Sequence, residues 1–297
     1  MRLLVIGDVH AASERVDWRD LLSRRVLAVA NHRLRRGKHF DPGLLAGIVE
    51  RMGGIEADGL ICTGDLTTTA LAEEFDSVRA ALEPARAAVV GRGGRAWVVP
   101  GNHDRYTFAS TRERRLEGAM TGWEPSRGSP AFEELTDAWS MLLLDSASPN
   151  VATSRGRLSV SQKLALQAAV DGLNGKKGLV VVCHYPPAVP EGVKDGGGRR
   201  LIDRDDMAEM VRGARGRVVW LHGHVHEPWW WPWEEDAVRG EALAGGGAIV
   251  AEGPGVATLN AGSPCWVDGR WPRGQGFWEL ELGVGEGGAT VRAVHHG

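Results

Sequence analysis

The sequence is poor in cysteine, in net charge and in long apolar runs. Its 297 residues include three cysteines, Cys62, Cys183 and Cys265, too few and too scattered for a disulfide framework or a CxxC zinc site. The net charge of −3 gives no overall basic field that would indicate nucleic-acid binding. No apolar run approaches the roughly 18 residues of a membrane span, and the first run reaches Asp8 before a signal-peptide core could be completed. We therefore expect a cytoplasmic protein, with peripheral contact at the inner membrane face left open.

What the sequence does contain is a repeated pattern of short apolar runs. Each run is nearly continuous and rich in β-branched residues, which is typical of strands buried on both faces. The runs are RLLVIG (2–7), DGLICTG (58–64), RAWVVPG (95–101), GLVVVC (178–183) and RVVWL (217–221). Segments with helical spacing lie between them, around residues 44–49, 71–82 and 164–173, and Ser159 or Ser161 is a candidate cap for the last. This alternation predicts an α/β fold.

The carboxyl-terminal part of the chain has a different pattern. The segments 256–262, 277–282 and 289–294 read as strands without helices between them, so we expect them to form a second, partly antiparallel sheet. The sequence has no internal repeat and no clear boundary, which favours a single domain over residues 1–297. Cap or insert segments are expected near 21–40, 105–135 and 227–247.

Metal-ligating side chains follow all five apolar runs. Ligands in α/β folds bind at the carboxyl ends of the strands, where these residues lie. They are Asp8, His10, Asp65, Asn102, His103, Asp104, His184, His222, His224 and His226. Singly, each has an ordinary explanation as a helix cap, a turn residue or a packed histidine. Together they offer carboxylate, amide and imidazole donors, a set that suits manganese, iron, zinc or nickel and not calcium.

The order of these motifs resembles that of the calcineurin-like metallophosphoesterase superfamily. The motifs are DVH (8–10), GD (64–65), GNHD (101–104), a lone His184 after an apolar strand, and GHVH (223–226). Each motif is weak alone, whereas the ordered set of five is specific and spans most of the chain. The resemblance implies a four-layer α/β/β/α sandwich of two mixed β-sheets flanked by helices.

The resemblance also implies a role for each residue. Asp8, His10 and His226 would hold one metal; Asn102, His184 and His224 would hold a second; Asp65 would bridge them. The cofactor would be two divalent transition-metal ions, with Mn²⁺ as first choice and Fe, Zn or Ni as alternatives. A metal-bridging hydroxide would then attack a phosphoester or pyrophosphate. His103 would stabilise the transition state or protonate the leaving oxygen, Asp104 could orient His103, and His222 is placed outside the ligand set.

Two stretches outside the motifs bear on the substrate. Residues 21–40 contain six basic and no acidic residues among apolar ones, which indicates a basic amphipathic helix at an anionic membrane or substrate, or simply a helix packed on the core. The segment 227–236, EPWWWPWEED, contains prolines 228 and 232, which argue against a regular strand or helix. Trp229–Trp233 could line a pocket, contact lipid, stack on a base or pack on themselves.

A basic helix just after the first metal motif loosely resembles, mainly over residues 1–66, the UDP-2,3-diacylglucosamine pyrophosphatase-type members of the superfamily, which implies a nucleotide-lipid substrate. The alternative is a soluble phosphodiesterase acting on cyclic nucleotides or other small diesters. A nuclease is disfavoured by the net charge, and a serine/threonine phosphatase by the short tail. A non-catalytic scaffold on the same fold would be expected to have eroded ligands, which this chain does not show. The sequence does not indicate the oligomeric state.

Overall fold

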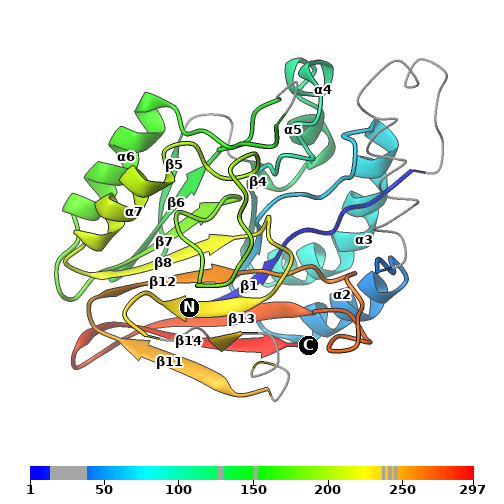
Figure 1. Ribbon diagram of the computed structural model, residues 1–297. Helices are drawn as coiled ribbons and strands as arrows, with labels where there is room; N and C mark the ends of the chain where they lie inside the picture. Colours follow the sequence, from blue (N-terminus) through cyan, green and yellow to red (C-terminus); the bar gives the residue numbers. More distant parts are fainter. Residues whose placement is uncertain (14–38, 126–129, 150–152, 236–237, 240–242, 244–245) are drawn as a thin grey trace.

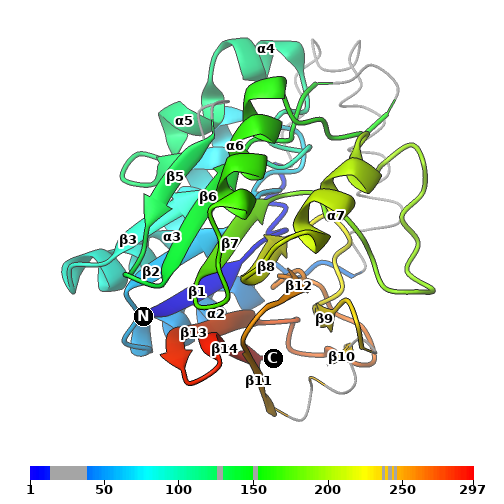
Figure 2. The same ribbon diagram turned by 90° about the vertical axis from the view of Figure 1, so that its left-hand side faces the viewer.

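The computed structural model describes residues 1–13, 39–125, 130–149, 153–235, 238–239, 243 and 246–297. Its described part is built from two mixed seven-stranded sheets that pack face to face. Helices cover the outer face of each sheet, so the chain forms four layers in the order α/β/β/α (Figures 1 and 2). The expected fold class is therefore confirmed.

The first sheet has the strand order β11-β14-β13-β1-β2-β3-β4. Strands β1 to β4 run parallel to one another, whereas β13 is antiparallel to β1 and places Trp278 opposite Val5. The bounds are β1 Arg2–Ile6, β2 Gly59–Cys62, β3 Arg95–Val98, β4 Glu124–Pro125, β11 Ala248–Glu252, β13 Phe277–Gly285 and β14 Gly288–His296.

The second sheet has the order β10-β9-β12-β8-β7-β6-β5. Its centre, β6-β7-β8-β12, is parallel, and antiparallel strands lie at both edges. The bounds are β5 Ala131–Glu134, β6 Trp139–Leu144, β7 Gly178–Cys183, β8 Arg217–His222, β9 Trp229–Pro232, β10 Val238–Arg239 and β12 Gly255–Asn260.

The helices divide between the two sheets. Helices α2 and α3 pack on the first sheet, and α6 and α7 pack on the second. The bounds are α2 Leu44–Gly54, α3 Ala72–Gly91, α4 Phe108–Arg112, α5 Arg115–Ala119, α6 Val160–Asp171 and α7 Arg204–Arg212. Ser159 caps α6 as expected, because its hydroxyl accepts a hydrogen bond from the Gln162 N–H at 3.3 Å.

Both faces of the central strands are buried, which explains their continuous apolar sequences. Successive strand residues point to opposite faces. In β1, Leu3 and Val5 therefore lie in the core between the sheets, while Leu4 and Ile6 lie beneath α2 and α3. The five apolar runs are confirmed as strands β1, β2, β3, β7 and β8.

Two expectations about the segments around these strands were wrong. The tail strands form no separate sheet: β12 inserts beside β8 in the second sheet, and β13 and β14 extend the first. Trp229–Pro232 is a regular strand, since its prolines stand just before it and at its last residue, where they interrupt little pairing. The end of the 105–135 segment supplies edge strands β4 and β5, and a cap over this segment stays a prediction.

The basic segment predicted at 21–40 lies outside the described residues, apart from His39 and Phe40. No helix in the described ranges is long and apolar enough to cross a membrane. The cytoplasmic location and the single-domain organisation stay predictions.

Candidate metal centre

Five loops from both sheets meet at one end of the molecule. Strands β1, β2 and β3 of the first sheet and β7 and β8 of the second all lead into these loops. The side chains they carry are Asp8 and His10 after β1, Asp65 after β2, Asn102 to Asp104 after β3, His184 after β7, and His224 and His226 after β8. The candidate ligands thus lie at the carboxyl ends of parallel strands, as the sequence predicted.

Four of these side chains form a compact group of potential metal ligands. One ligand atom from each of Asp8, His10, Asp65 and His226 lies within 4.8 Å of all the others. The Nε2 atoms of His10 and His226 are 2.9 Å apart, and His226 Nε2 lies 3.3 Å from Asp8 Oδ1. Residues more than 200 positions apart in the chain therefore converge on one small volume.

A second group adjoins the first through Asp65. The Oδ2 atom of Asp65 lies 3.7 Å from His10 Nε2 and 3.4 Å from His184 Nε2. The ring of His184 is 5.3 Å from that of His224, whose Nδ1 is 3.0 Å from Asn102 Oδ1. Asp65 thus stands between the two groups, in the position that a bridging ligand would require.

Backbone strain is concentrated in these loops. Seven non-glycine residues in the described part have positive φ, and five of them are candidate ligands. Those five are Asp8 (49°), His10 (52°), Asp65 (52°), His224 (74°) and His226 (60°). Such conformations cost on the order of 1–3 kcal/mol each and persist only where the surrounding structure enforces them, most often at functional sites. The geometry of the ligands is therefore maintained at the expense of stability.

Two glycines allow the ligand carboxylates to approach the backbone. A Cβ atom at Gly101 would lie 2.1 Å from Asp65 Oδ1, and one at Gly223 would lie 2.2 Å from Asp8 Oδ2. Both distances are far below van der Waals contact, so any side chain at these positions would displace a carboxylate.

Backbone groups orient several of the ligands. His184 Nδ1 lies 2.9 Å from the Thr63 carbonyl, which accepts its hydrogen and leaves Nε2 facing Asp65. The His224 N–H donates to Asp8 Oδ2 at 3.0 Å, and the Ser263 hydroxyl donates to the Asp8 carbonyl at 2.7 Å. These contacts fix side chains that are already almost inaccessible to solvent.

The buried carboxylates are held ionised by the histidines around them. Burial alone would raise the pKa of Asp8, but hydrogen bonding to His10 and His226 holds it well below its ordinary value. Burial also opposes ionisation of Asp65, whose pKa is nevertheless lowered, chiefly by the charge of His184. Conversely, burial would lower the pKa of His184, yet the Asp65 carboxylate raises it to about 9. Asp65 and His184 thus favour each other's charged form.

Other imidazoles of the cluster are held neutral, which is the form that binds metals. Burial lowers the pKa of His10 to about 3 and that of His222 to about 4, and it also depresses that of His224. His222 Nδ1 lies 2.9 Å from the Gly223 carbonyl and its ring packs against Trp229, outside the two ligand groups.

His103 and Asp104 occupy different positions relative to the centre. The ring of His103 is 4.8 Å from that of His10, and its Nδ1 lies 2.7 Å from the Thr68 carbonyl. Burial and the Asp65 charge raise the pKa of Asp104 to about 6. The Asp104 carboxylate accepts hydrogen bonds from the N–H groups of Leu66, Thr67 and Gly101 and from the Thr67 hydroxyl.

These residues fit a bound cation. His184 Nε2 is fully buried and has no hydrogen-bond partner among the described residues, although it lies beside an ionised carboxylate. A buried polar atom without a partner is unfavourable unless a ligand satisfies it. The donors are oxygen and imidazole nitrogen, which suits a divalent transition metal.

Comparison with known proteins agrees with this geometry. The sequence profile of a family described as calcineurin-like phosphoesterase matches residues 1–228. The chain belongs to this family. It is therefore a metallophosphoesterase, and the family uses two divalent metal ions. A search of curated proteins found no match.

Solved structures also resemble this phosphoesterase. A dimetal phosphatase from Danio rerio has a TM-score of 0.56 at 14% identity, with 98% of each chain covered. A putative 5'-nucleotidase from Staphylococcus aureus, in complex with alpha-ketoglutarate, has a TM-score of 0.49 at 12% identity, with 99% of this chain and 53% of that chain covered. At 14% identity the first likeness shows a shared fold.

Several neighbours of the centre were not anticipated from the phosphoesterase sequence. The ring of Tyr185 lies 4.4 Å from that of His224, and Trp266 lies 6.2 Å from His226. Tyr185 directly follows His184, a signal that could have been used. Thr63 and Thr68 contribute backbone carbonyls, which every residue type has, so the sequence could not indicate their roles. Conversely, Trp229 and Trp230 are buried in the protein, so these two rings cannot line a pocket or stack on a base.

Proposed function

We propose that the protein hydrolyses a phosphoester or pyrophosphate with two divalent transition-metal ions, Mn²⁺ being the first choice. Asp8, His10 and His226 would hold one ion. Asn102, His184 and His224 would hold the other, and Asp65 would bridge the two. The observation that carries this proposal is the position of Asp65, within 3.7 Å of imidazole nitrogens from both groups.

The residues of the chain would divide the work between binding and proton transfer. When bound, two such cations neutralise charge on phosphoryl oxygens and lower the pKa of water. The Thr68 carbonyl accepts the hydrogen of His103 Nδ1, which leaves Nε2 as the nitrogen that can exchange a proton. His103 would then protonate the leaving oxygen from Nε2.

Asp104 would act through the loops and not on substrate. Its buried carboxylate accepts hydrogen bonds from the loop after β2 and from Gly101, so it ties together the loops that carry Asp65 and His103. We therefore assign Asp104 a positioning role, whereas the sequence suggested that it orients the His103 ring directly.

The substrate class is a separate proposal with two candidates. A nucleotide-lipid such as UDP-2,3-diacylglucosamine would require an apolar surface beside the centre, and membrane contact through 21–40 and the outer rings Trp231 and Trp233 would assist it. Within the Trp segment, Trp229 and Trp230 are buried, whereas Trp231 and Trp233 are partly exposed. Cyclic nucleotides or other small diesters are the alternative, with Trp266 near His226 as a base-stacking surface.

A substrate panel tests the proposal. Protein reconstituted with Mn²⁺ would be assayed on aryl monoesters and diesters, cyclic nucleotides and UDP-lipids, with the metal content measured in parallel. We expect turnover and about two ions per chain. Asn102→Ala should lower turnover by about tenfold or more, whereas Asn174→Ala, in an exposed turn at the other end of β7, should not. A chain that binds less than about one ion and cleaves none of the esters would refute the proposal and support the scaffold alternative.

A further inference from the structure

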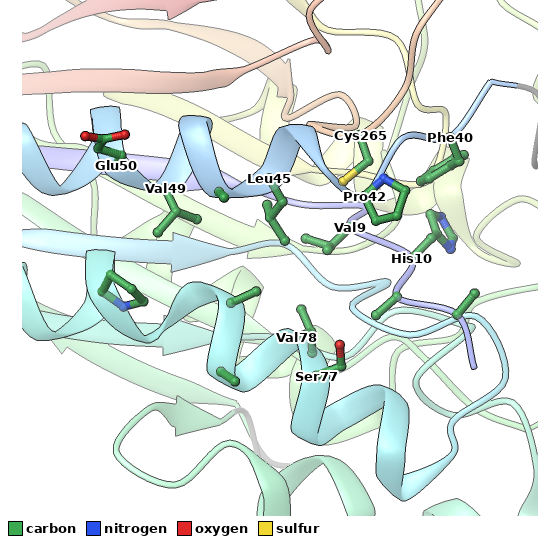
Figure 3. A pocket seen from close by; sticks show the side chains of 16 residues that line it. Val9, His10, Phe40, Pro42, Leu45, Val49, Glu50, Ser77, Val78 and Cys265 are labelled. Carbon is green, nitrogen blue, oxygen red and sulfur yellow. The ribbon is translucent and has the colours of Figure 1, made fainter. Parts of the chain in front are cut away.

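An apolar groove opens beside the metal centre, between α2 and α3 (Figure 3). Its volume of about 680 Å³ is in the range of small-molecule sites, roughly 300–1,000 Å³. Leu45 and Val49 of α2 form one wall and Val78 of α3 forms the other. Figure 3 shows His10 at one end of the groove and Glu50 at the other.

Alanines leave this space open along the two helices. Ala46 of α2 and Ala80 of α3 line the groove and are exposed, while Leu45, Val49 and Val78 are buried along it. A longer side chain at either alanine would extend into the groove. The groove thus depends on small side chains at Ala46 and Ala80, because the longer side chains of most helix-forming residues would occupy its space.

The lining selects a neutral, apolar ligand. Most lining residues are aliphatic, and none of those described is Lys or Arg. Among the described lining residues the only carboxylate is that of Glu50, at the end far from His10, so an anionic group would not be attracted there. Burial of hydrocarbon is the dominant favourable interaction that such a surface offers.

The groove adjoins the metal centre at His10. His10 belongs both to the compact ligand group and to the groove lining. Phe40 also lines the groove, and its ring packs edge-on against His10 at 5.5 Å. The groove therefore begins directly beside a side chain of the compact ligand group.

We propose that this groove binds a linear hydrocarbon chain carried by the substrate, so that the enzyme acts on phosphoesters with an alkyl or acyl chain. The inference rests on the proposed function, since the metal centre would hold the phosphoryl group. From Leu45 to Glu50 the groove follows five residues of α2, about 8 Å at 1.5 Å per residue. This length accommodates several methylene groups.

A chain-length series tests the proposal. The substrates are methyl, butyl and octyl 4-nitrophenyl phosphate with the Mn²⁺-loaded protein. In each, water adds to phosphorus, the bond to the aryl oxygen breaks, 4-nitrophenolate leaves and the alkyl phosphate is released. Each methylene that enters the groove can lower KM by at most about fourfold. We expect KM for the octyl ester to be at least tenfold below that of the methyl ester.

Groove-filling variants give the matched comparison. Ala46→Leu and Ala80→Leu, singly and together, should remove the chain-length dependence while leaving turnover of the methyl ester unchanged. Ala87→Leu is the control, because Ala87 is an exposed alanine of α3 outside the groove. Calorimetric titration of metal-free protein with 1-octanol reports on the groove without catalysis, and should show binding that the double variant loses and the control keeps.

The outcomes separate the two proposals. If none of the three esters is cleaved but octanol binds as expected, the hydrolase proposal fails and the groove stands as an apolar binding site. If the methyl ester is cleaved and KM does not depend on chain length, or octanol binds the double variant as well as the wild type, the groove proposal is overturned.

Discussion

The replacement of Gly223 by alanine tests whether the centre depends on close packing around Asp8. The new Cβ would lie 2.2 Å from Asp8 Oδ2, and ordinary contact begins at 3.4 Å, so atoms must separate by about 1.2 Å. Asp8 is fully buried, and its carboxylate already accepts a hydrogen bond from the His224 N–H. It therefore cannot turn away without losing a contact that joins the β1 and β8 loops.

The expected magnitude follows from this displacement. Overpacking of a buried site costs typically about 1–3 kcal/mol of the free energy of unfolding. A misplacement of about 1 Å can lower turnover by roughly 100-fold, and disturbance of groups around a metal typically lowers metal affinity by about 10- to 100-fold. We expect Gly223→Ala to fold, to bind metal weakly and to be nearly inactive.

Three measurements on the variant decide the matter: metal content, turnover of an aryl phosphodiester, and the free energy of unfolding in urea. Gly47→Ala is the control, since no atom lies within 4 Å of a Cβ there, in the exposed face of α2. It should gain about 0.5–1 kcal/mol of stability and keep full activity. If Gly223→Ala kept full metal content and turnover within twofold of wild type, the packing argument would be refuted.

Three further substitutions test other parts of the structure. Arg105→Leu leaves the buried carboxylate of Asp145 and the partly buried carboxylate of Glu117 without their cation. It should lower the free energy of unfolding by about 3–5 kcal/mol in urea titrations, and a loss below 1 kcal/mol would contradict this. Ser159→Ala removes the cap of α6 and should cost about 1 kcal/mol by thermal unfolding, and no change would rule out the cap. Mn²⁺ at 100 times its Kd should raise the free energy of unfolding of the wild type by about 2.7 kcal/mol. The same Mn²⁺ concentration should not stabilise Asp65→Asn, and an equal stabilisation of this variant would exclude Asp65 as a ligand.

The fold was predictable where one local rule determines the outcome. Central strands that are buried on both faces must be apolar throughout, so β1 and β7 were evident from their sequences. Assignment of strands to sheets has no such local signature. The segment 256–262 supplies most of β12, which pairs in parallel with β8 from an earlier part of the chain. Only packing between segments that are distant in sequence determines this pairing. Trp229 and Trp230 were misjudged because Pro228 and Pro232 mark the limits of a four-residue strand as readily as they mark a loop.

The site was predictable from residue type and order to the extent that side chains form it. Parallel strands end on the same side, so Asp8, Asp65 and His184 were expected to meet. The contributions of Thr63 and Thr68 were not, because their backbone carbonyls, and not their side chains, orient His184 and His103. The role of Asp104 likewise depends on which amides happen to face it, a property of the folded loops alone.

The location of the centre explains why strain and buried charge are tolerated there. Asp8 and Asp65 come from the first sheet, whereas His184, His224 and His226 come from the second. Attraction between these acids and a shared cation would therefore act across the boundary between the two sheets. Without a cation, the same groups leave ionised carboxylates in a buried volume together with five residues of positive φ. The apolar core between the sheets, with Leu3, Val180 and Trp278 among its members, must supply the stability that these loops give up.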